Sequence, residues 1–311
     1  MKDLNQFRKW WYRKTLPSEF RHLKRLHPDF KLKRLGILED SYYEIFWKQK
    51  LVGTTKPLSN LTKPQSERCF IVATGPSLNE IDFEQLANET LLGVNGAVAK
   101  CNENIFMQYH FISDASFVIT RLPFVEKMIS SGADCLFSFA TLNNICECKP
   151  ELLKANNVFL LPEINLQYDV PKKNAVAFDL WAESEPEIIL HDNSRLKDGR
   201  VGFSKNINQG VFTAQTVVFE AVQTAAYLGF KKINILGMDL NFNQDTSRFY
   251  EHKKDVVKSR INRDFEPYVL PAFEVAEKVA EHEGFEIFNL SPDSRLPATV
   301  IKKISFEDAI Q

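Results

Sequence analysis

Apolar residues between Gln209 and Tyr250 follow first the period of a helix and then that of a strand. The helical part repeats its apolar residues at spacings of three and four, which gathers them on one face. These residues are Val218, Ala221, Val222, Ala225 and Leu228. Gly229 suits the left-handed end of a helix, and the apolar run 233–236 predicts a buried strand followed by Asp239. A carboxylate just past a buried strand lies at the carboxyl edge of a sheet, where open α/β sheets bind ligands.

The rest of the body repeats this alternation of strands and helices. Short apolar runs predict further strands at 69–73, 91–95, 105–112, 135–139, 158–161 and 286–290. Helical spacing predicts helices over 79–88, 117–131 and 267–284. Strands that alternate with helices predict an α/β fold with a Rossmann-like, mostly parallel sheet that carries helices on both faces.

The N-terminal residues differ from this body in charge and in pattern. Residues 1–34 contain 11 Lys or Arg and 3 Asp or Glu, whereas the whole chain of 311 residues has a net charge of -1. Residues 51–66 have the Pro, Ser and Thr content of a linker. We therefore predict a basic, aromatic, helical arm with its linker at 1–66 and a folded domain at 67–311. Within that domain, the polar and acidic stretch around 165–205 is expected to form a lid-like insertion.

Aromatic and basic side chains lie close together near the start of the arm. They are Arg8, Lys9, Trp10, Trp11, Arg13 and Lys14. This mixture suits the boundary of an anionic membrane, although a helix packed on the body, or a nucleic-acid contact, would use the same residue types. No stretch approaches the ~20 apolar residues of a membrane span, and a signal-peptide apolar region is missing. We expect a cytoplasmic protein at a membrane surface, without a nucleic-acid partner.

The sequence lacks the common metal-binding patterns. Its five cysteines are scattered, and Cys146 and Cys148 have no second Cys or His pair nearby, which argues against zinc. Neither an HExxH motif nor an Asp-x-Asp motif is present. We expect no metal and no cofactor.

Small and polar residues follow three successive predicted strands. They are Thr74-Gly75-Pro76-Ser77, Asn95-Gly96 and Ser113-Asp114. The first turn is neither a Walker loop nor Gly-x-Gly-x-x-Gly, but its amide and hydroxyl suit one phosphate or a ribose. Gln209-Gly210, before the predicted helix, offers amides and a helix dipole to an anion. Arg248 and Tyr250 could complete a phosphate site.

Several short motifs between residues 69 and 304 occur together in one order. They are ATGPS, VNGA, ISDAS, GRVGFSKNINQG (199–210), the GMD strand, SRFYE (247–251), Arg263-Asp264 and NLSPDSRL (289–296). In these motifs the chain resembles the lipopolysaccharide-core transferases of 3-deoxy-D-manno-octulosonic acid (Kdo), the WaaZ type. The resemblance implies transfer of Kdo from CMP-Kdo to an inner-core sugar, without metal. It also implies a peripheral enzyme on the inner face of the inner membrane.

More distantly, the chain resembles the CMP-sialic-acid transferases with a Gly-Pro-Ser-Leu Rossmann-like domain, which implies a GT-A-like variant of that fold. In that family, Asn residues at the positions matching Thr74, Asn95 and Asp114 contact CMP. Two of the three positions depart from Asn here. The donor therefore stays open between Kdo and sialic acid.

Transfer from a CMP-sugar requires a site for the departing phosphate and a base for the acceptor hydroxyl. We expect the nucleotide and its phosphate to be held by Thr74, Gly75, Pro76, Ser77, Asn95, Gly96, Gln209, Gly210, Arg248 and Tyr250. Asp239 and Asp114 are the preferred bases, followed by His252 and Asp264.

Two other classes of function fit parts of the sequence. The Gly-Pro-Ser-Leu turn also resembles a pterin diphosphokinase-type fold, which would need ATP and Mg²⁺, and the missing Asp-x-Asp argues against it. A non-catalytic scaffold at a membrane surface would explain the basic arm but not the polar residues at the strand ends. No motif specifies the acceptor sugar, the linkage or the oligomeric state.

Overall fold

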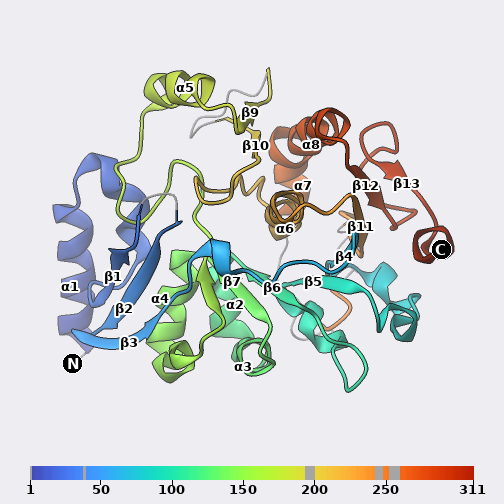
Figure 1. Ribbon diagram of the computed structural model, residues 1–311. Coiled ribbons are helices and arrows are strands. Elements are labelled where there is room, and N and C mark those ends of the chain that lie inside the picture. Colours follow the sequence, from blue (N-terminus) through green and yellow to red (C-terminus); the bar gives the residue numbers. More distant parts are fainter. Residues whose placement is uncertain (1, 38–39, 193–199, 242–247, 252–259) are drawn as a thin grey trace. The chain divides into compact units, whose positions relative to one another are not determined.

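The computed structural model describes residues 2–37, 40–192, 200–241, 248–251 and 260–311 (Figure 1). These residues form two compact units, each assembled from separate stretches of the chain. The first unit contains Met1–Leu61, Ile112–Trp181 and Ile207–Val211, and the second contains Thr62–Phe111, Ala182–Asn206 and Phe212–Gln311. The N-terminal residues therefore fold together with a central stretch of the chain, which the predicted division at residue 66 does not include.

The second unit is built on parallel strands in the order β13-β12-β11-β4-β5-β6. The strand bounds are β4 Arg68–Val72, β5 Thr90–Val94, β6 Tyr109–Ile112, β11 Lys232–Leu236, β12 Glu286–Asn289 and β13 Lys302–Lys303. Val72 lies opposite Leu236 on one side and Gly93 on the other. This confirms the predicted parallel sheet, and its register brings the carboxyl ends of β4, β5 and β11 side by side.

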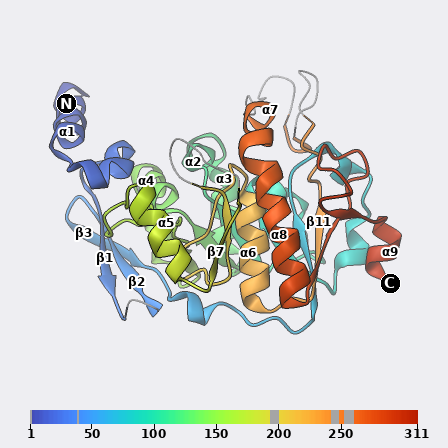
Figure 2. The same cartoon turned by 90° about the horizontal axis from the view of Figure 1, so that it is seen from above.

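Helical segments cover both faces of this sheet, as predicted. Helices α6 (Val217–Leu228) and α8 (Leu270–Glu283) lie side by side on one face (Figure 2), with the rings of Phe219 and Phe273 5.4 Å apart. On the other face, buried side chains of β4 pack against η4 (Pro76–Asn79), η5 (Phe83–Leu86) and α9 (Phe306–Ile310).

The predicted helix over 79–88 is wrong in detail, because two short 3-10 helices occupy this stretch. Pro76 begins η4, and the side chain of Asp82 caps η5 by accepting from the amide of Glu84. A proline and an Asp cap each start a new helical segment. The chain therefore turns twice here.

The remaining elements of the second unit are short. They are η6 Asn95–Lys100, β9 Ile188–Leu190, β10 Gly202–Ser204, α7 Ile261–Asp264 and the π-helix η8 Phe265–Val269. Strands β9 and β10 pair in an antiparallel ladder. The stretch 165–205, which we expected to be a lid-like insertion, thus contains this ladder and helix α5 (Ala175–Ser184).

The first unit combines helices with an antiparallel sheet and a parallel strand pair. Its helices are α1 Lys2–Thr15, η1 Ser18–Arg25, η3 Leu58–Asn60, α2 Ala115–Thr120, α3 Leu122–Ser130, α4 Phe139–Cys148 and η7 Pro150–Lys154. Its strands are β1 Phe30–Leu35, β2 Tyr42–Trp47, β3 Lys50–Thr54, β7 Asp134–Phe137 and β8 Val158–Leu160. Strands β1, β2 and β3 form the antiparallel sheet, and β7 pairs with β8 in parallel. The helix predicted over 117–131 is divided at Arg121, whose φ of -140° is not helical.

Part of the stretch predicted as arm and linker forms the antiparallel sheet, with strands between residues 30 and 54. Residues 50–54, which overlap the predicted linker, are strand β3. A Cβ on Gly53 would lie 1.9 Å from the carbonyl oxygen of Leu153, so this strand packs backbone to backbone on η7. The part of the predicted linker that lies in β3 is therefore tightly packed and not free.

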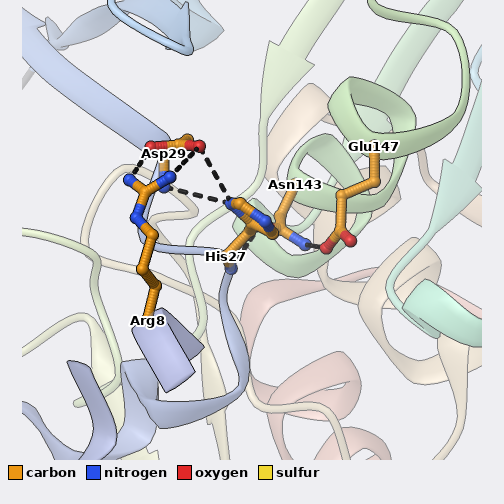
Figure 3. Close-up of polar contacts among 5 residues, drawn as sticks. All are labelled: Arg8, His27, Asp29, Asn143 and Glu147. Carbon is orange, nitrogen blue, oxygen red and sulfur yellow. Dashed lines mark hydrogen bonds and ion pairs between the residues drawn. The ribbon is translucent and has the colours of Figure 1, made fainter. Parts of the chain in front are cut away.

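Helix α1 is tied to the turn before β1 by polar contacts (Figure 3). The Arg8 guanidinium donates to both oxygens of the Asp29 carboxylate, at 3.1 Å for Nη1. The amide of Asp29 donates to His27 Nδ1 at 3.1 Å, and the amide of His27 donates to Asn143 Oδ1 at 2.8 Å. The start of the basic arm is thereby connected to α4. Among the described residues, no helix has the length and apolar content needed to cross a membrane.

Candidate functional site

The turns that follow β4 and β11 in the second unit are hydrogen bonded to each other. The amide of Ala73 donates to the carbonyl of Leu236, and that of Gly75 to the carbonyl of Gly237, both at 2.8 Å. Gly237 has a φ of +71°, which reverses the chain directly after β11. The two turns are thus held together at one edge of the sheet.

The Asp239 carboxylate lies against the Gly75–Ser77 turn. Its Oδ2 accepts from the amide of Ser77 at 2.9 Å, and its Oδ1 accepts from the Ser77 hydroxyl at 2.5 Å. A Cβ on Gly75 would lie 2.3 Å from Asp239 Oδ2, so only glycine permits this approach. The amide and hydroxyl that we expected to hold a phosphate therefore hold an internal carboxylate. Asp239, expected as a base, already accepts two hydrogen bonds.

The end of β12 extends this cluster. The hydroxyls of Ser291 and Ser77 are 3.2 Å apart, and the amide of Ser291 donates to Asn289 Oδ1 at 3.0 Å. Asn289 is fully buried, and its Nδ2 has no hydrogen-bond partner. Sequence reasoning missed both residues, although NLSPDSRL follows the last predicted strand and so marks the same edge of the sheet.

The end of β5 presents Asn95 in a conformation that non-glycine residues seldom adopt. Its φ is +48°, and its Oδ1 is buried without a hydrogen-bond partner. A Cβ on the next residue, Gly96, would lie 2.0 Å from the Tyr250 ring, so Tyr250 rests directly on this backbone. The amide of Phe249 donates to the carbonyl of Thr74 at 3.2 Å. The structure thus brings Thr74, Gly96 and Tyr250 together, as expected for one site.

Two cations lie close to this edge. Arg248 donates to Glu251 Oε1 at 2.8 Å, and the Glu251 side chain is almost fully buried. The Arg248 guanidinium is therefore already engaged by a carboxylate of the same loop. Lys100, which sequence reasoning missed, donates to the carbonyl of Leu78 at 3.1 Å and lies 5.0 Å from the ring centres of Phe83 and Phe249. Burial lowers the pKa of Lys100.

The other expected bases are placed elsewhere. Asp114 caps α2, because its Oδ1 accepts from the amide and the hydroxyl of Ser116 at 2.9 and 2.7 Å. The buried Asp264 accepts from Arg263 Nε at 2.7 Å and from Nη2 at 3.0 Å. His252 lies outside the described residues. Asp114 belongs to the first unit, whereas Asp239 and Asp264 belong to the second.

The expected anion seat at Gln209-Gly210 is not a helix start. Helix α6 begins at Val217 with Thr216 as its N-cap. The amide of Gly210 donates to the carbonyl of Ile207 at 3.1 Å, and Gly210 has a φ of +115°. The prediction placed the helix too early, because Ala214 and Gln215, both with positive φ, form a turn that apolar spacing does not reveal.

A further carboxylate, Glu163, lies just past the end of β8 in the first unit. Burial raises the pKa of Glu163 to about 7, and Lys172 lowers it in part. Sequence reasoning missed this residue, which lies between the predicted strand at 158–161 and the expected lid. Glu163 follows a buried strand at a position equivalent to that of Asp239, and this position could have identified it as a candidate.

The predicted membrane residues lie in and near α1. Phe7, Trp10 and Trp11 expose 58%, 50% and 57% of their surface. Arg8 pairs with Asp29, and Arg13 Nε donates to the carbonyl of Lys24 at 3.2 Å, so these two cations are partly engaged within the protein. Lys14 is exposed, and the side chain of Lys9 is outside the described part.

Within the described residues, no group of three or more His, Cys, Asp or Glu side chains is arranged to hold a metal ion. The described cysteines are all free, and burial raises the pKa of Cys135 and Cys146, the latter to about 12. These thiols pack as apolar residues.

Known proteins match most of the chain. The family model described as 3-deoxy-D-manno-octulosonic acid transferase WaaZ matches residues 54–307. The probable 3-deoxy-manno-octulosonic acid transferase of Escherichia coli K12 is 23% identical over 81% of this chain and 88% of its own length. The Salmonella typhimurium protein of that description is 22% identical over 80% of this chain and 90% of its own. Among solved structures, the monofunctional alpha-2,3-sialyltransferase Cst-I from Campylobacter jejuni gives a TM-score of 0.41 at 15% identity, covering 78% of this chain and 82% of that one.

Proposed function

Because the chain belongs to the WaaZ family of Kdo transferases, we propose that it transfers Kdo from CMP-Kdo to a sugar of the lipopolysaccharide inner core. Family membership makes the chain a glycosyltransferase. The CMP-activated donor, the inner-core acceptor and the independence from metal are the proposed parts. Kdo is a 2-keto acid, so departure of CMP leaves an oxocarbenium-like centre beside a carboxylate. The enzyme must then stabilise the leaving phosphate and remove a proton from the acceptor hydroxyl.

The main support for the donor site is the side-chain oxygen Oδ1 of Asn95, which is buried and has no hydrogen-bond partner. Buried polar atoms in proteins are nearly always hydrogen bonded, so an unpaired one indicates a missing partner. A ribose hydroxyl or the amino group of cytosine would donate to this oxygen. The left-handed backbone of Asn95 and the close contact of the Tyr250 ring with Gly96 constrain the backbone that carries this oxygen.

Tyr250 and Arg248 are assigned to the leaving phosphate. Each can donate to a phosphate oxygen, and a charge-assisted bond from a guanidinium is about twice as strong as a neutral one. Asp239 positions this site by holding the Gly75–Ser77 turn against β11. A negative carboxylate at that point repels phosphate and favours ribose hydroxyls, as a carboxylate at the strand ends of dinucleotide-binding folds does.

The test is calorimetric titration of the full-length protein with CMP, CMP-Kdo and CMP-sialic acid, each with EDTA and with Mg²⁺. We expect CMP and CMP-Kdo to bind with affinities that Mg²⁺ changes little. Asn95→Ala should weaken CMP binding about tenfold, the size of one hydrogen bond to a buried group. Asn79→Ala, an exposed change in the neighbouring turn, is the control. Binding that requires Mg²⁺, or binding of CMP-sialic acid without binding of CMP-Kdo, would contradict the proposal.

We further infer that α1 places the enzyme on the inner face of the inner membrane. The support is the exposure of Phe7, Trp10 and Trp11 together on a basic helix. Trp10→Ala with Trp11→Ala should release the protein from phosphatidylglycerol vesicles, whereas Ile37→Ala, an exposed apolar change elsewhere in the first unit, should not. If the Trp10/Trp11 double variant sediments with the vesicles as fully as Ile37→Ala does, α1 is not the membrane contact.

A further inference from the structure

Lys100, the last residue of η6, reaches across to the segment that follows β4 in the same unit. Its Nζ donates to the carbonyl of Leu78 at 3.1 Å. Leu78 is fully buried, and a Cβ on Gly237 would lie 2.6 Å from its side chain, so this residue packs directly under the turn after β11. The Lys100 ammonium is therefore fixed beside the residue that follows the Gly75–Ser77 turn.

Two aromatic rings lie against the Lys100 ammonium. The ring centres of Phe83 and Phe249 are each 5.0 Å from Nζ. Phe83 is a buried residue of η5, whereas Phe249 belongs to the segment 248–251, which carries Arg248 and Tyr250. An ammonium within about 6 Å of a ring centre is attracted to the ring face, and more strongly where water is partly excluded. Lys100 thus connects the segment 248–251 to the core of the second unit.

Phe249 transmits this contact to the strand-end site. Its ring lies 5.3 Å from the Tyr250 ring at an interplanar angle of 89°, and its amide donates to the carbonyl of Thr74 at 3.2 Å. The Tyr250 ring in turn rests on the backbone of Gly96. Movement of the Phe249 ring would therefore displace Tyr250 from the end of β5.

The charge of Lys100 has a cost that its packing does not require. The side chain is half-buried, and burial lowers the pKa of Lys100 because it disfavours the charged form. Its described partners are one carbonyl oxygen and two ring faces, and none of them carries a net charge. An uncharged side chain of the same length would fill this space equally well. The ammonium is needed for its attraction to the rings and to the carbonyl of Leu78.

We propose that Lys100 is a positioning residue of the donor site. Its ammonium holds the Phe249 ring and thereby places the segment 248–251, so that Tyr250 and Arg248 can meet the leaving phosphate. This inference rests on the proposed transfer from CMP-Kdo. It goes beyond that proposal by assigning a role to a residue that acts on the nucleotide through Phe249.

The first test compares CMP with cytidine, which lacks the phosphate, by calorimetric titration of the full-length protein. Lys100→Met keeps the length of the side chain and removes the ammonium. It should weaken CMP binding about tenfold and leave cytidine binding unchanged, because only CMP presents a phosphate to the segment 248–251. Lys100→Arg keeps a cation over the ring and should retain most of the CMP affinity. Lys302→Met is the matched control, because the exposed Lys302 lies over the Phe288 ring at 5.6 Å on another strand pair of the same unit.

A double-mutant cycle tests whether Lys100 acts through Phe249. Phe249→Leu keeps an apolar side chain and removes the ring, and it should weaken CMP binding to a similar extent. The double variant Lys100→Met with Phe249→Leu should bind CMP no more weakly than Phe249→Leu alone, since the effects of residues in contact are not additive. Titration of the four proteins with CMP measures this coupling.

CMP affinity in Lys100→Met equal to that of the wild type would overturn the inference while leaving the donor assignment standing. Equal weakening of CMP and cytidine would also overturn it, because the effect would then be on the fold and not on the phosphate contact. Additive losses in the double variant would mean that Lys100 acts independently of Phe249. Wild-type protein that fails to bind CMP would instead contradict the proposed donor.

Discussion

Asp239 in the second unit and Glu163 in the first occupy equivalent positions after a parallel strand but differ in their partners. Each carboxylate comes three residues after the last residue of its strand, β11 or β8. Asp239 accepts two hydrogen bonds from Ser77, whereas no described side chain or amide donates to Glu163. A strand end therefore marks the functional edge of a sheet, but the role of its carboxylate depends on the groups that reach it. A carboxylate that is already paired positions a turn, and an unpaired one remains available to a ligand.

The largest expected effect is at the paired carboxylate. Asp239→Ala leaves the Ser77 amide without its acceptor and should weaken CMP binding about 100-fold, since hydrogen bonds to charged groups contribute about 1.5–3 kcal/mol each. Asp239→Asn can keep both contacts to Ser77, so its affinity for CMP should fall only about tenfold. Calorimetry with CMP and turnover measured on the same preparations check this, with the exposed Asp293→Asn as control.

Asp239→Asn separates positioning from base catalysis. A variant that binds CMP normally but turns over two to four orders of magnitude more slowly would restore Asp239 as the base.

The buried carboxylate of Glu251, which pairs with Arg248, lies between the paired Asp239 and the unpaired Glu163 in this comparison. Arg248→Ala removes the guanidinium that pairs with the buried Glu251 carboxylate and should lower the free energy of unfolding by about 3 kcal/mol. It should also weaken CMP binding about tenfold through loss of a phosphate contact. Urea unfolding and calorimetry measure the two effects separately.

The double change Arg248→Ala with Glu251→Gln also removes the buried negative charge that has lost its guanidinium. It should recover most of the stability but none of the CMP affinity. Recovery of both would mean that Arg248 serves only Glu251.

Gly75→Ala tests how closely Asp239 must approach its turn. The added Cβ would meet Asp239 Oδ2 at 2.3 Å and the carbonyl oxygen of Gly237 at 2.5 Å, so the two turns must move apart. Overpacking of this kind costs about 1–3 kcal/mol, and we expect weaker CMP binding together with a lower Tm. The exposed Asn79→Ala should change neither. An unchanged Tm in Gly75→Ala would show that the turns are not held together as described.

The smallest expected effect is at the unpaired carboxylate and has the opposite sign. The fold raises the pKa of Glu163 from 4.5 to about 7, so the folded state binds this proton more tightly than the unfolded state. Stability is then lost as the pH rises from 4.5 to about 7, and the loss is complete above that range. Glu163→Gln has no proton to lose, so it should be more stable than the wild type at pH 8, by roughly 1 kcal/mol after allowance for solvent, and equal at pH 4.5. Thermal unfolding at both pH values measures this, and lower stability of the variant at pH 8 would mean that the carboxylate has a structural partner.

The sequence by itself determined the alternation of strands and helices and the edge at which polar residues gather. Helical spacing and short apolar runs are both local patterns in the sequence. The buried strands β4, β5, β11 and β12 were therefore predictable from neighbouring residues. The polar residues after them, from Thr74 to Asp239, were predictable for the same reason. The type of reaction was also predictable, because the family motifs are short stretches of consecutive residues.

Only the tertiary structure decided which of these groups meet. Ser77 and Asp239 are 162 positions apart, and no local pattern states that the amide turn holds a carboxylate instead of a phosphate. The strand β3 looked like a linker, because its packing on Leu153 appears only when the chain is folded. The start of α6 and the isolation of Glu163 were undetermined for the same reason. Periodicity fixes the backbone of each segment, whereas desolvation and pairing depend on residues that are distant in sequence.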